Sequence, residues 1–370
     1  MSSRFLVAPD KFKGSLTAKE AADAMIAGII AACPTAEIDY CPIADGGEGF
    51  MDALAEAMHG EWIDCPAVDA LNRPIQSRYA IAQTAEGKIA IMEMAETAGI
   101  WRIGKDELCP LLATTKGVGM QIADAVLNHQ VDRVILGLGG SATNDGGAGM
   151  AAALGVEFLD ASGQPIDVVP QCFSQLASVD LSKRIPLPAM VAACDVENPL
   201  LGNRGATAVF SKQKGASDED RLLLERALAA LADHSAGWVA AEKPGAGAAG
   251  GLGFGLLHFT GATLESGFDL ISGLLRLDER VASASHVVTG EGALDYQSLA
   301  GKGPVSLARM AVRSGVPVTA FCGMVDQEVR ASGLFHGIHS LAETGLPLDE
   351  LISRAGTLLS EIAERTFRKS

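Results

Sequence analysis

The sequence predicts an α/β protein of two domains, and three observations support that prediction. The chain has 370 residues, more than one ordinary core needs, since domains average roughly 150 residues. Hydrophobic residues make up 48% of it and charged residues 20%, so a sizeable core is expected. Short apolar segments alternate with amphipathic ones at both ends of the chain. This βαβα rhythm is typical of a parallel sheet.

The N-terminal segment begins the rhythm. Thr17 precedes an amphipathic run, and Glu20 follows three residues later, which is the signature of a capping box. The pattern predicts, in order, a strand, a helix, a strand and a helix: Phe5–Ala8, Ala18–Ala32, Glu37–Ile43 and Gly49–His59.

The rhythm changes in the middle of the chain. Three apolar segments joined by short turns favour antiparallel pairing: Trp62–Val68, Ile75–Ala82 and Lys88–Met94. After them the pattern predicts a helix, a strand, a helix, two strands and a long helix: Lys116–Asn128, Val131–Leu138, Gly147–Leu154, Ala189–Cys194, Thr207–Phe210 and Asp218 to about Glu242.

The parallel rhythm returns near the C-terminal end. Pro244–Gly255 is rich in Gly and Ala and reads as a linker or a tight loop. Beyond it we expect two strands and two helices: Ala284–Thr289, Val316–Phe321, Val305–Ser314 and Leu348–Arg368. The two chain ends therefore resemble each other, and we predict a discontinuous domain of residues 1–60 plus 258–370, with residues 61–257 inserted as a second domain.

Charge and composition limit the partners. The formal net charge is −16, which argues against nucleic acid and against an anionic membrane surface, because both need clustered Lys and Arg. No export-signal pattern and no apolar run of membrane-spanning length stands in the sequence, so a cytoplasmic protein is expected. The sequence leaves the oligomeric state open, a homodimer included.

Four polar or glycine-rich clusters follow expected strands. In parallel sheets ligands bind at the carboxyl ends of strands, so these clusters are candidates for one site. The first contains Asp10, Lys11, Lys13 and Ser15, a group suited to a carboxylate or phosphate anion. The alternative to a binding role is that both lysines are ordinary solvent-exposed side chains.

The second cluster is Asp45-Gly-Gly-Glu-Gly49. Its double glycine lets the backbone approach a ligand closely. Asp45 and Glu48 carry the hard oxygen ligands that Mg²⁺ prefers. A glycine turn with acids that cap the following helix is the structural alternative.

The third cluster, Gly137–Gly149, lies between an expected strand and an expected helix. Successive glycine N–H groups before a helix form a nest for phosphate. Asp145 could hold a metal ion or a hydroxyl. The other candidate ligand-binding residues of this cluster are Gly139, Gly140, Ser141, Thr143, Asn144 and Gly146.

The same cluster partly fits a dinucleotide-binding fingerprint, Gly137-x-Gly139-x-x-Ala142. That interpretation needs a second strand with an acid about 20 residues on, and Glu157 and Asp160 are only rough candidates. No G-x-x-x-x-G-K-[ST] motif occurs.

The fourth cluster supplies Glu291 and Asp295, with Lys302 soon after as a point charge for phosphate. Asp195 follows the expected strand Ala189–Cys194. A carboxylate there could act as general base toward a hydroxyl, or could simply cap a turn.

Taken together these motifs resemble the bacterial glycerate kinase type 1 family over nearly the whole chain. The matching segments are Ala8–Ser15, Pro42–Gly49, Gly139–Gly147, Thr289–Asp295, Phe210–Ala216 and Pro244–Gly253. Ser211-Lys212 departs from the Gly-Pro expected before Gln213-Lys214. The resemblance implies a Rossmann- or flavodoxin-like domain and an inserted swivelling β/α domain. It also implies ATP- and Mg²⁺-dependent phosphorylation of D-glycerate, at the 2-hydroxyl.

Residue roles follow from physical inference within that family. The glycine-rich cluster and Lys302 would bind ATP phosphates, and Asp45 and Asp145 would hold Mg²⁺. Lys11 and Lys13 would bind the glycerate carboxylate or the moving phosphoryl group, and Asp195 or Asp295 would accept the hydroxyl proton. The remaining substrate-binding candidates are Asp10, Ser15, Glu48 and Glu291. Two other classes stay open: a nicotinamide-dependent oxidoreductase of a small hydroxy acid, and a non-catalytic sugar-acid binding protein.

Overall fold

The computed structural model describes residues 3–43, 46–47, 49–296, 298–300 and 303–368. The chain divides into two compact units. Unit 1 contains residues 1–45, 52–57 and 268–370, and unit 2 contains residues 46–51 and 58–267. The chain returns from unit 2 to unit 1 after Gly267, and the short segment 46–51 belongs to unit 2. The domain boundaries expected from the sequence remain a prediction.

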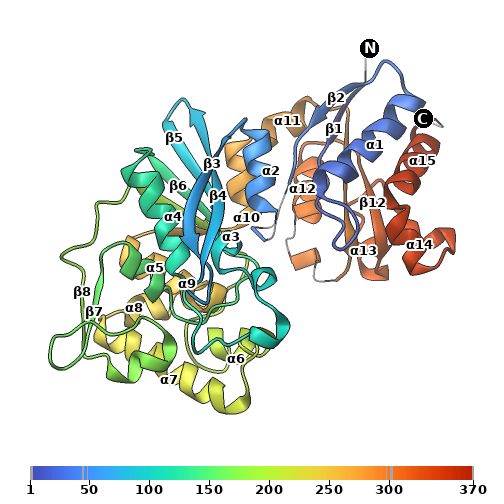
Figure 1. Ribbon diagram of the computed structural model, residues 1–370. Helices are drawn as coiled ribbons and strands as arrows, with labels where there is room; N and C mark the ends of the chain where they lie inside the picture. The colour runs from blue at the N-terminus through green and yellow to red at the C-terminus, as the bar shows by residue number, and fades with distance from the viewer. Residues whose placement is uncertain (1–2, 44–45, 48, 297, 301–302, 369–370) are drawn as a thin grey trace. The chain divides into compact units, whose positions relative to one another are not determined.

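Unit 1 is built on a five-stranded parallel sheet (Figure 1). Its strands are β1 (Arg4–Val7), β2 (Glu37–Tyr40), β11 (His286–Leu294), β12 (Val318–Val325) and β13 (Gly337–Ser340). Its helices are α1 (Ala18–Ala32), α11 (Leu277–Ser283), α12 (Gly303–Arg313), α13 (Gln327–Ala331), α14 (Leu348–Ser353) and α15 (Ala355–Phe367). Two further helices span unit boundaries, α2 (Phe50–Ala57) and α10 (Gly267–Leu274).

The strand order of this sheet is β13-β12-β11-β1-β2. Counted along the chain within unit 1 it is 2-1-3-4-5, which is the flavodoxin-like doubly wound order. In such sheets the strand order reverses between the first and third strands, here β1 and β11, and ligands bind at that point. The topology therefore predicts a ligand site at the carboxyl ends of β1 and β11.

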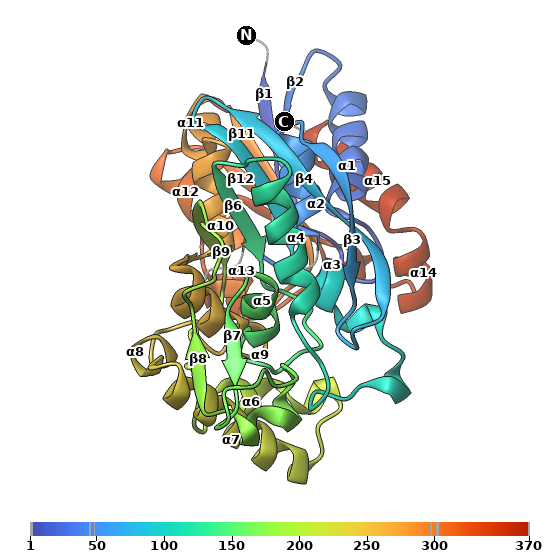
Figure 2. The ribbon, with the colours of Figure 1, turned by 60° about the vertical axis from the view of Figure 1, so that its left-hand side comes forward.

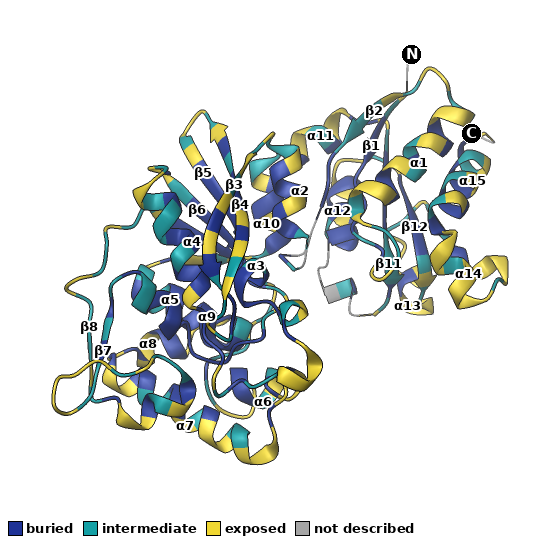
Figure 3. Ribbon diagram, viewed as in Figure 1, coloured by how far each residue is buried: buried dark blue, intermediate teal, exposed yellow. Residues whose placement is uncertain are grey.

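Alternation along β1 explains why helices cover both faces. Phe5 and Val7 pack with α1 and α15 on one face, whereas Leu6 and Ala8 pack with α11 and α12 on the other. Successive strand side chains point to opposite faces, so an all-apolar strand must be buried on both. In Figure 3 most of β1 is buried, and the outer faces of α1 and α14 are exposed.

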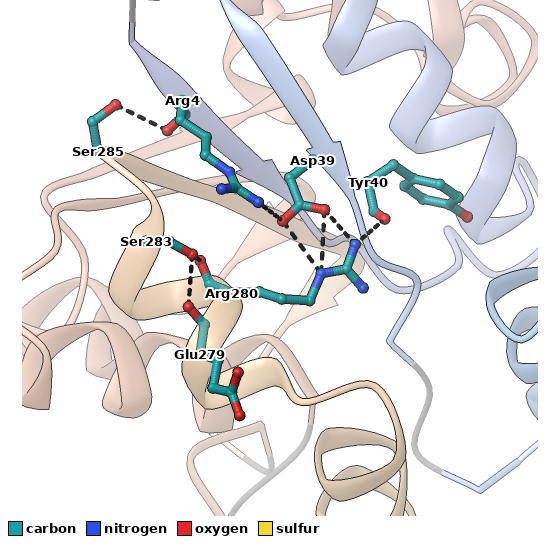
Figure 4. A network of polar contacts seen from close by, with 7 residues as sticks. All are labelled: Arg4, Asp39, Tyr40, Glu279, Arg280, Ser283 and Ser285. Carbon is teal, nitrogen blue, oxygen red and sulfur yellow. Dashed lines mark hydrogen bonds and ion pairs between the residues drawn. The ribbon is translucent and has the colours of Figure 1, made fainter. Parts of the chain in front are cut away.

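The edge strand β2 is fastened to α11 by charge (Figure 4). The Arg4 guanidinium lies 3.1 Å from Asp39, and Arg280 pairs with Asp39 and donates to the Tyr40 carbonyl at 2.6 Å. Burial alone would raise the pKa of Asp39, but the two guanidiniums outweigh it and lower the pKa of that carboxyl. These contacts tie the edge strand β2 to α11 and to β1.

Unit 2 is built on a six-stranded mixed sheet in the order β10-β9-β6-β5-β4-β3. Strands β10, β9, β6 and β5 are parallel, and β5, β4 and β3 are antiparallel. Strand bounds are β3 (Glu61–Val68), β4 (Pro74–Thr84), β5 (Gly87–Glu93), β6 (Arg133–Gly137), β9 (Ala189–Ala193) and β10 (Thr263–Glu265). Strands β7 (Glu157–Leu159) and β8 (Ser178–Asp180) pair only with each other, as the small ribbon of Figure 2.

The helices of unit 2 are α3 (Ala95–Ala98), α4 (Lys116–Leu127), α5 (Ala148–Ala153), α6 (Ala206–Phe210), α7 (Asp218–His234), α8 (Trp238–Ala241) and α9 (Ala248–Gly255). The expected antiparallel strands and the Thr17–Glu20 capping box of unit 1 are confirmed. No helix among the described residues is both long and apolar enough to cross a membrane.

Three expectations about elements are wrong. Thr207–Phe210 lies in helix α6 instead of a strand, because Thr207 accepts helical hydrogen bonds from Ser211 and is buried. The long helix from Asp218 ends at His234, because Ala236 adopts φ +56°. The last helix is divided at Arg354 into α14 and α15.

One more segment differs from expectation. Strand β11 runs to Leu294, so the fourth cluster lies largely inside the strand and not after it. For Pro244–Gly255 the structure favours the tight loop over the linker, because residues from Ala248 onward form α9, with left-handed backbone at Ala249, Gly250 and Gly251.

Candidate active site

The turn after β1 and the strand β11 come together at the switch point of unit 1. The Asp10 N–H donates to the Gly290 carbonyl at 2.8 Å. A Cβ at Gly292 would lie 3.2 Å from the Lys13 nitrogen, so the two segments are in close contact at this glycine. The first and fourth sequence clusters are therefore neighbours in space.

Asp10 and Lys11 lie at the inner end of this turn. Asp10 is buried, and its Oδ1 accepts from the Lys11 N–H at 2.7 Å. Lys11 is half-buried and Lys13 is exposed. The Ser15 hydroxyl donates to the Ile352 carbonyl at 2.8 Å, which gives it a role in fastening the turn. Lys11 and Lys13 stay the predicted cations for an anionic ligand at this turn.

Two carboxylates share one buried hydroxyl in the same unit. The Ser298 Oγ is 3.0 Å from Glu291 Oε1 and 3.2 Å from Asp295 Oδ1. Asp295 also accepts the Ser298 N–H at 2.9 Å. The hydroxyl carries one proton, so it can donate to only one of these acids at a time. Lys302, expected beside them, lies outside the described residues.

In unit 2, the turn after β6 connects that strand to α5 and is made of two different halves. Gly139, Gly140 and Ser141 are half-buried or exposed, whereas Ala142 and every residue after it through Gly149 are buried. Among the described residues, the N–H groups of the first three have no protein acceptor. The accessible half therefore presents donors, as an anion-binding turn does.

The buried half is packed backbone against backbone. A Cβ at Gly250 would lie 1.9 Å from the Thr143 carbonyl oxygen, and Gly250 has φ +69°. The Gly146 N–H donates to the Gly250 carbonyl at 3.1 Å. The Gly/Ala-rich segment near Gly250 thus supports the turn after β6 and is not a second ligand loop.

Asp145 organises this turn from within. It is fully buried, and Oδ2 accepts the N–H and Oγ1–H of Thr115, both at 2.8 Å, and the Gly149 N–H at 3.1 Å, while Oδ1 accepts the Gly147 N–H at 3.1 Å. Burial raises the pKa of its carboxyl, and these donors oppose that shift. With four protein donors, Asp145 is better suited to holding the turn than to the metal role expected for it.

Two polar atoms in the turn lack partners. Within the described part of the chain, Thr143 Oγ1 and Asn144 Oδ1 are buried without a hydrogen-bond partner, although the Asn144 amide donates to Thr207 Oγ1 at 3.1 Å. Such orphaned atoms are uncommon in native cores and often mark a place that binds water or ligand.

The two strands that neighbour β6 each have a carboxylate at or just beyond their carboxyl end. Glu93 ends β5, is buried, and accepts the N–H groups of Gly49 and Met51 at 3.2 and 3.3 Å. Asp195 stands two residues beyond β9, is exposed, and accepts the Gly267 N–H at 3.0 Å. Strands β5 and β9 are the two neighbours of β6. Glu93 was not expected from the sequence, since a single acid inside an apolar strand gives no local signal.

The segment after Asp45 lies beside the same turn. A Cβ at Gly46 would be 3.0 Å from the Ala193 Cβ, and one at Gly137 would be 3.2 Å from the Gly46 carbonyl oxygen. The second and third sequence clusters are therefore adjacent in unit 2. The predicted ligands Asp45 and Glu48 lie outside the described residues.

A second missed residue is Lys214, from a short 3-10 turn (Lys212–Lys214). It is 1% exposed, and its ammonium donates to Ser141 Oγ and to the Thr143 carbonyl, each at 2.6 Å. Burial lowers its pKa to about 7, against the opposing charge of Asp145. The sequence marks Phe210–Ala216 only as a family motif. It cannot show that Lys214 is buried while Lys212 is exposed.

The arrangement does not suit a dinucleotide fold. Glu157 lies in β7, which belongs to the separate ribbon, and it pairs with Lys183 at 2.7 Å. Asp160 accepts from Ser162 and Gln164 in its own turn. Neither acid follows a strand beside β6, where a ribose-binding acid would stand.

Comparison with known proteins agrees with these motifs. The model of the glycerate kinase family matches residues 5–370. A glycerate kinase of Halalkalibacterium halodurans is 39% identical over 367 residues, covering 97% of this chain and 96% of that protein. The glycerate kinase of Bacillus subtilis is 38% identical, covering 99% and 96%. The glycerate 2-kinase of Escherichia coli is 36% identical, covering 88% and 86%.

A solved structure supports the fold as well. The crystal structure of a protein assigned as glycerate kinase 2 from Salmonella typhimurium LT2 superposes with a TM-score of 0.87 at 33% identity, covering 100% of this chain and 98% of that one. The α/β fold with parallel sheets is thereby confirmed. The family match and the near-complete coverage of these relatives show that this chain belongs to the glycerate kinase family, and is thus a kinase that acts on a hydroxyl acceptor.

Proposed function

We propose that this protein transfers the γ-phosphoryl group of ATP, with Mg²⁺, to the 2-hydroxyl of D-glycerate. The relatives named above as glycerate kinases, and the Escherichia coli protein named as a 2-kinase, support substrate and position. The observation that carries the proposal is the turn after β6, whose accessible N–H groups from Gly139 to Ser141 have no acceptor in the described protein.

ATP fits the residues present. Phosphoryl transfer depends on positioning and charge stabilisation more than on covalent chemistry by the protein. The N–H groups of Gly139, Gly140 and Ser141 would bind phosphate oxygens. Thr143 and Asn144 stand behind them with orphaned oxygens that bound water or ligand donors would satisfy. Gly146 lies in the buried half and would shape the turn instead of touching ATP.

Mg²⁺ also fits the donor chemistry. The ion is usually held by one or two carboxylates together with substrate phosphates, and no larger cluster of acids, His and Cys is found in the described residues. Asp195, and Asp45 as expected from the sequence, are the candidate ligands at this edge of the sheet. When bound there, the ion would neutralise charge on the phosphate oxygens.

The acceptor would bind in unit 1. Lys11 and Lys13 would hold the glycerate carboxylate, and Asp10 would fix the backbone at Lys11 through the 2.7 Å hydrogen bond. Asp295 would accept the proton of the 2-hydroxyl, with Glu291 beside it. In-line transfer then requires the acceptor hydroxyl to come within reach of the γ-phosphate.

The test is ADP release by the purified protein with ATP, Mg²⁺ and D-glycerate, followed by phosphorus NMR of the product. L-glycerate and acid-free reactions are the controls. D-glycerate-dependent ADP with a 2-phosphate signal is the expected result. A 3-phosphate signal would overturn the acceptor position alone, and no ADP above controls would overturn the proposal.

The proton acceptor is tested by two matched variants. Asp295→Asn should lower kcat by roughly 10²- to 10⁴-fold, as loss of a general base does, while Asp195→Asn should mainly raise the Mg²⁺ concentration needed for half-maximal rate. The reverse pattern would move the base to Asp195.

A further inference from the structure

Lys214 is a buried cation directly behind the accessible half of the turn after β6. Its ammonium donates at 2.6 Å to Ser141 Oγ, in the accessible half, and at 2.6 Å to the Thr143 carbonyl, in the buried half. The side chain is 1% exposed. One lysine thus ties together the two halves of the turn proposed to bind phosphate.

A purely structural role does not explain why a lysine, and not a neutral residue, occupies position 214. Burying an ammonium costs several kcal/mol unless it is paired. Lys214 has no ion pair within 4 Å in the described part of the chain, and Asp145 acts on it only as a more distant charge. Asp145 itself already holds four protein donors. A neutral donor such as Gln could satisfy an oxygen more cheaply, so the positive charge itself needs an explanation.

We infer that Lys214 is a positioning residue for the nucleotide's phosphates, acting through Ser141 and through its charge behind the Gly139–Ser141 turn. This inference rests on the proposed function. The ammonium holds the Ser141 hydroxyl oxygen as an acceptor, which leaves the hydroxyl proton free to point outward to a phosphate oxygen. In its protonated form the buried ammonium favours an anion over a neutral ligand at the turn, because screening by water is weak there.

The test compares Lys214→Met with Lys212→Met in the full-length protein. Lys212 lies on the same 3-10 turn but is exposed, so its variant is the matched control. Calorimetric affinities are measured for ATP, ADP, AMP and adenosine. Lys214→Met should weaken ATP and ADP by about 10- to 100-fold, which corresponds to loss of one charged interaction, and should leave adenosine unchanged. Lys212→Met should leave all four unchanged.

Kinetics give an independent readout. In Lys214→Met the KM for ATP should rise while the KM for D-glycerate stays unchanged. Equal affinity loss for adenosine and ATP, or no loss at all in a folded Lys214→Met protein, would overturn the inference. If the wild type neither binds ATP nor releases ADP, the proposed function fails instead.

Ser141→Ala keeps the test decisive if Lys214→Met does not fold. The half-buried Ser141 side chain is removed while the lysine stays. The variant should lose affinity for ATP and ADP by about tenfold and keep its affinity for adenosine. Wild-type affinity for all the nucleotides in Ser141→Ala would contradict the inference.

Discussion

The turn after β6 in unit 2 and the turn after β1 in unit 1 both end a parallel strand, but different forces hold them. In unit 2 the turn is buried from Ala142 onward, and backbone atoms of Gly146 and Gly250 lie in direct contact. In unit 1 the turn exposes Lys13 and Gly14. It is held by backbone hydrogen bonds, such as Phe12 N–H to the Leu16 carbonyl at 2.8 Å, and by the side-chain bond from Ser15 to Ile352. The first turn is buried and packed backbone against backbone, whereas the second presents side chains to solvent.

Because of this difference, we expect substitutions in the two turns to affect different properties, stability in one and activity in the other. A change in the glycine packing of unit 2 should first damage the fold, and activity only as a result. A change in the lysines of unit 1 should damage the chemistry and leave the fold intact. The following predictions can break or sharpen that contrast.

The largest effect is expected from Gly250→Ala. Its Cβ would stand 1.9 Å from the Thr143 carbonyl oxygen, at φ +69°. A backbone clash in a packed core should cost more than about 4 kcal/mol of unfolding free energy, measured by urea titration. Gly163→Ala is the control, since it has φ +78° with nothing within 4 Å, and should cost only about 1 kcal/mol. Equal costs would show that the close approach is unimportant.

Lys11→Ala should give the opposite behaviour. We expect turnover to fall by roughly a hundredfold or more, because one charge aimed at the reacting anion is lost, while the melting temperature changes little. Steady-state kinetics and thermal unfolding check this. Lys19→Ala, which removes an exposed lysine paired with Asp23 on α1, should retain full turnover. An active Lys11→Ala protein would remove Lys11 from the proposed site.

The stability of unit 1 should fall on mild acidification through His286. Its Nε2 lies 2.9 Å from Thr319 Oγ1, and burial, then the charge of His336, lowers its pKa to about 4. The unfolded chain binds this proton near pH 6.5. The contribution is therefore complete above pH 6.5 and is lost as the pH falls toward 4. We expect a loss of about 2 kcal/mol over that range.

Urea titrations of the wild type and of His286→Gln at several pH values test this. The variant should show a shallower decline in unfolding free energy between pH 6.5 and 4. Identical pH profiles would mean that other groups cause the acid sensitivity.

The smallest effect concerns the edge of the unit 1 sheet. Arg280→Ala removes the contacts to Asp39 and to the Tyr40 carbonyl, but Arg4 still pairs with Asp39. For a partly buried pair we expect a cost of about 1–2 kcal/mol that shrinks in high salt. Arg276→Ala, which loses only the exposed contact to Glu279, should cost less than about 0.5 kcal/mol. A salt-independent loss would point to packing instead of charge.

Local chemistry made much of the fold predictable. Thr17 and Glu20 fix the start of α1 within a few residues, and the alternating segments before Met94 give the antiparallel strands. The first and fourth clusters are neighbours within unit 1, and Gly46 of the second cluster lies beside the third within unit 2; that all four form one site stays a prediction. These signals lie within short stretches of chain, so reading the sequence is enough to find them.

The predictions that fail concern residues whose structure depends on contacts far away in the sequence. Thr207 and Val209 favour a strand by their branched side chains, but α6 forms because Thr207 is buried and bonded to Asn144. Asp145 has the residue type of a metal ligand, yet a threonine 30 residues away donates twice to its Oδ2. The sequence gives no sign that Lys214 or Glu93 is buried, since burial of a charge is a property of the whole fold.

The pairing of β1 with β11 has a consequence for synthesis. The Ala8 N–H donates to the Val288 carbonyl, so the first strand of the chain waits for a partner made about 280 residues later. At roughly 5–20 residues per second on the ribosome, that wait lasts on the order of 15–60 s. The chain of unit 2 emerges during that interval and can fold first. Until β11 emerges, the apolar residues Phe5, Leu6 and Val7 of β1 lack part of the core that buries them, which makes this segment a candidate for chaperone binding.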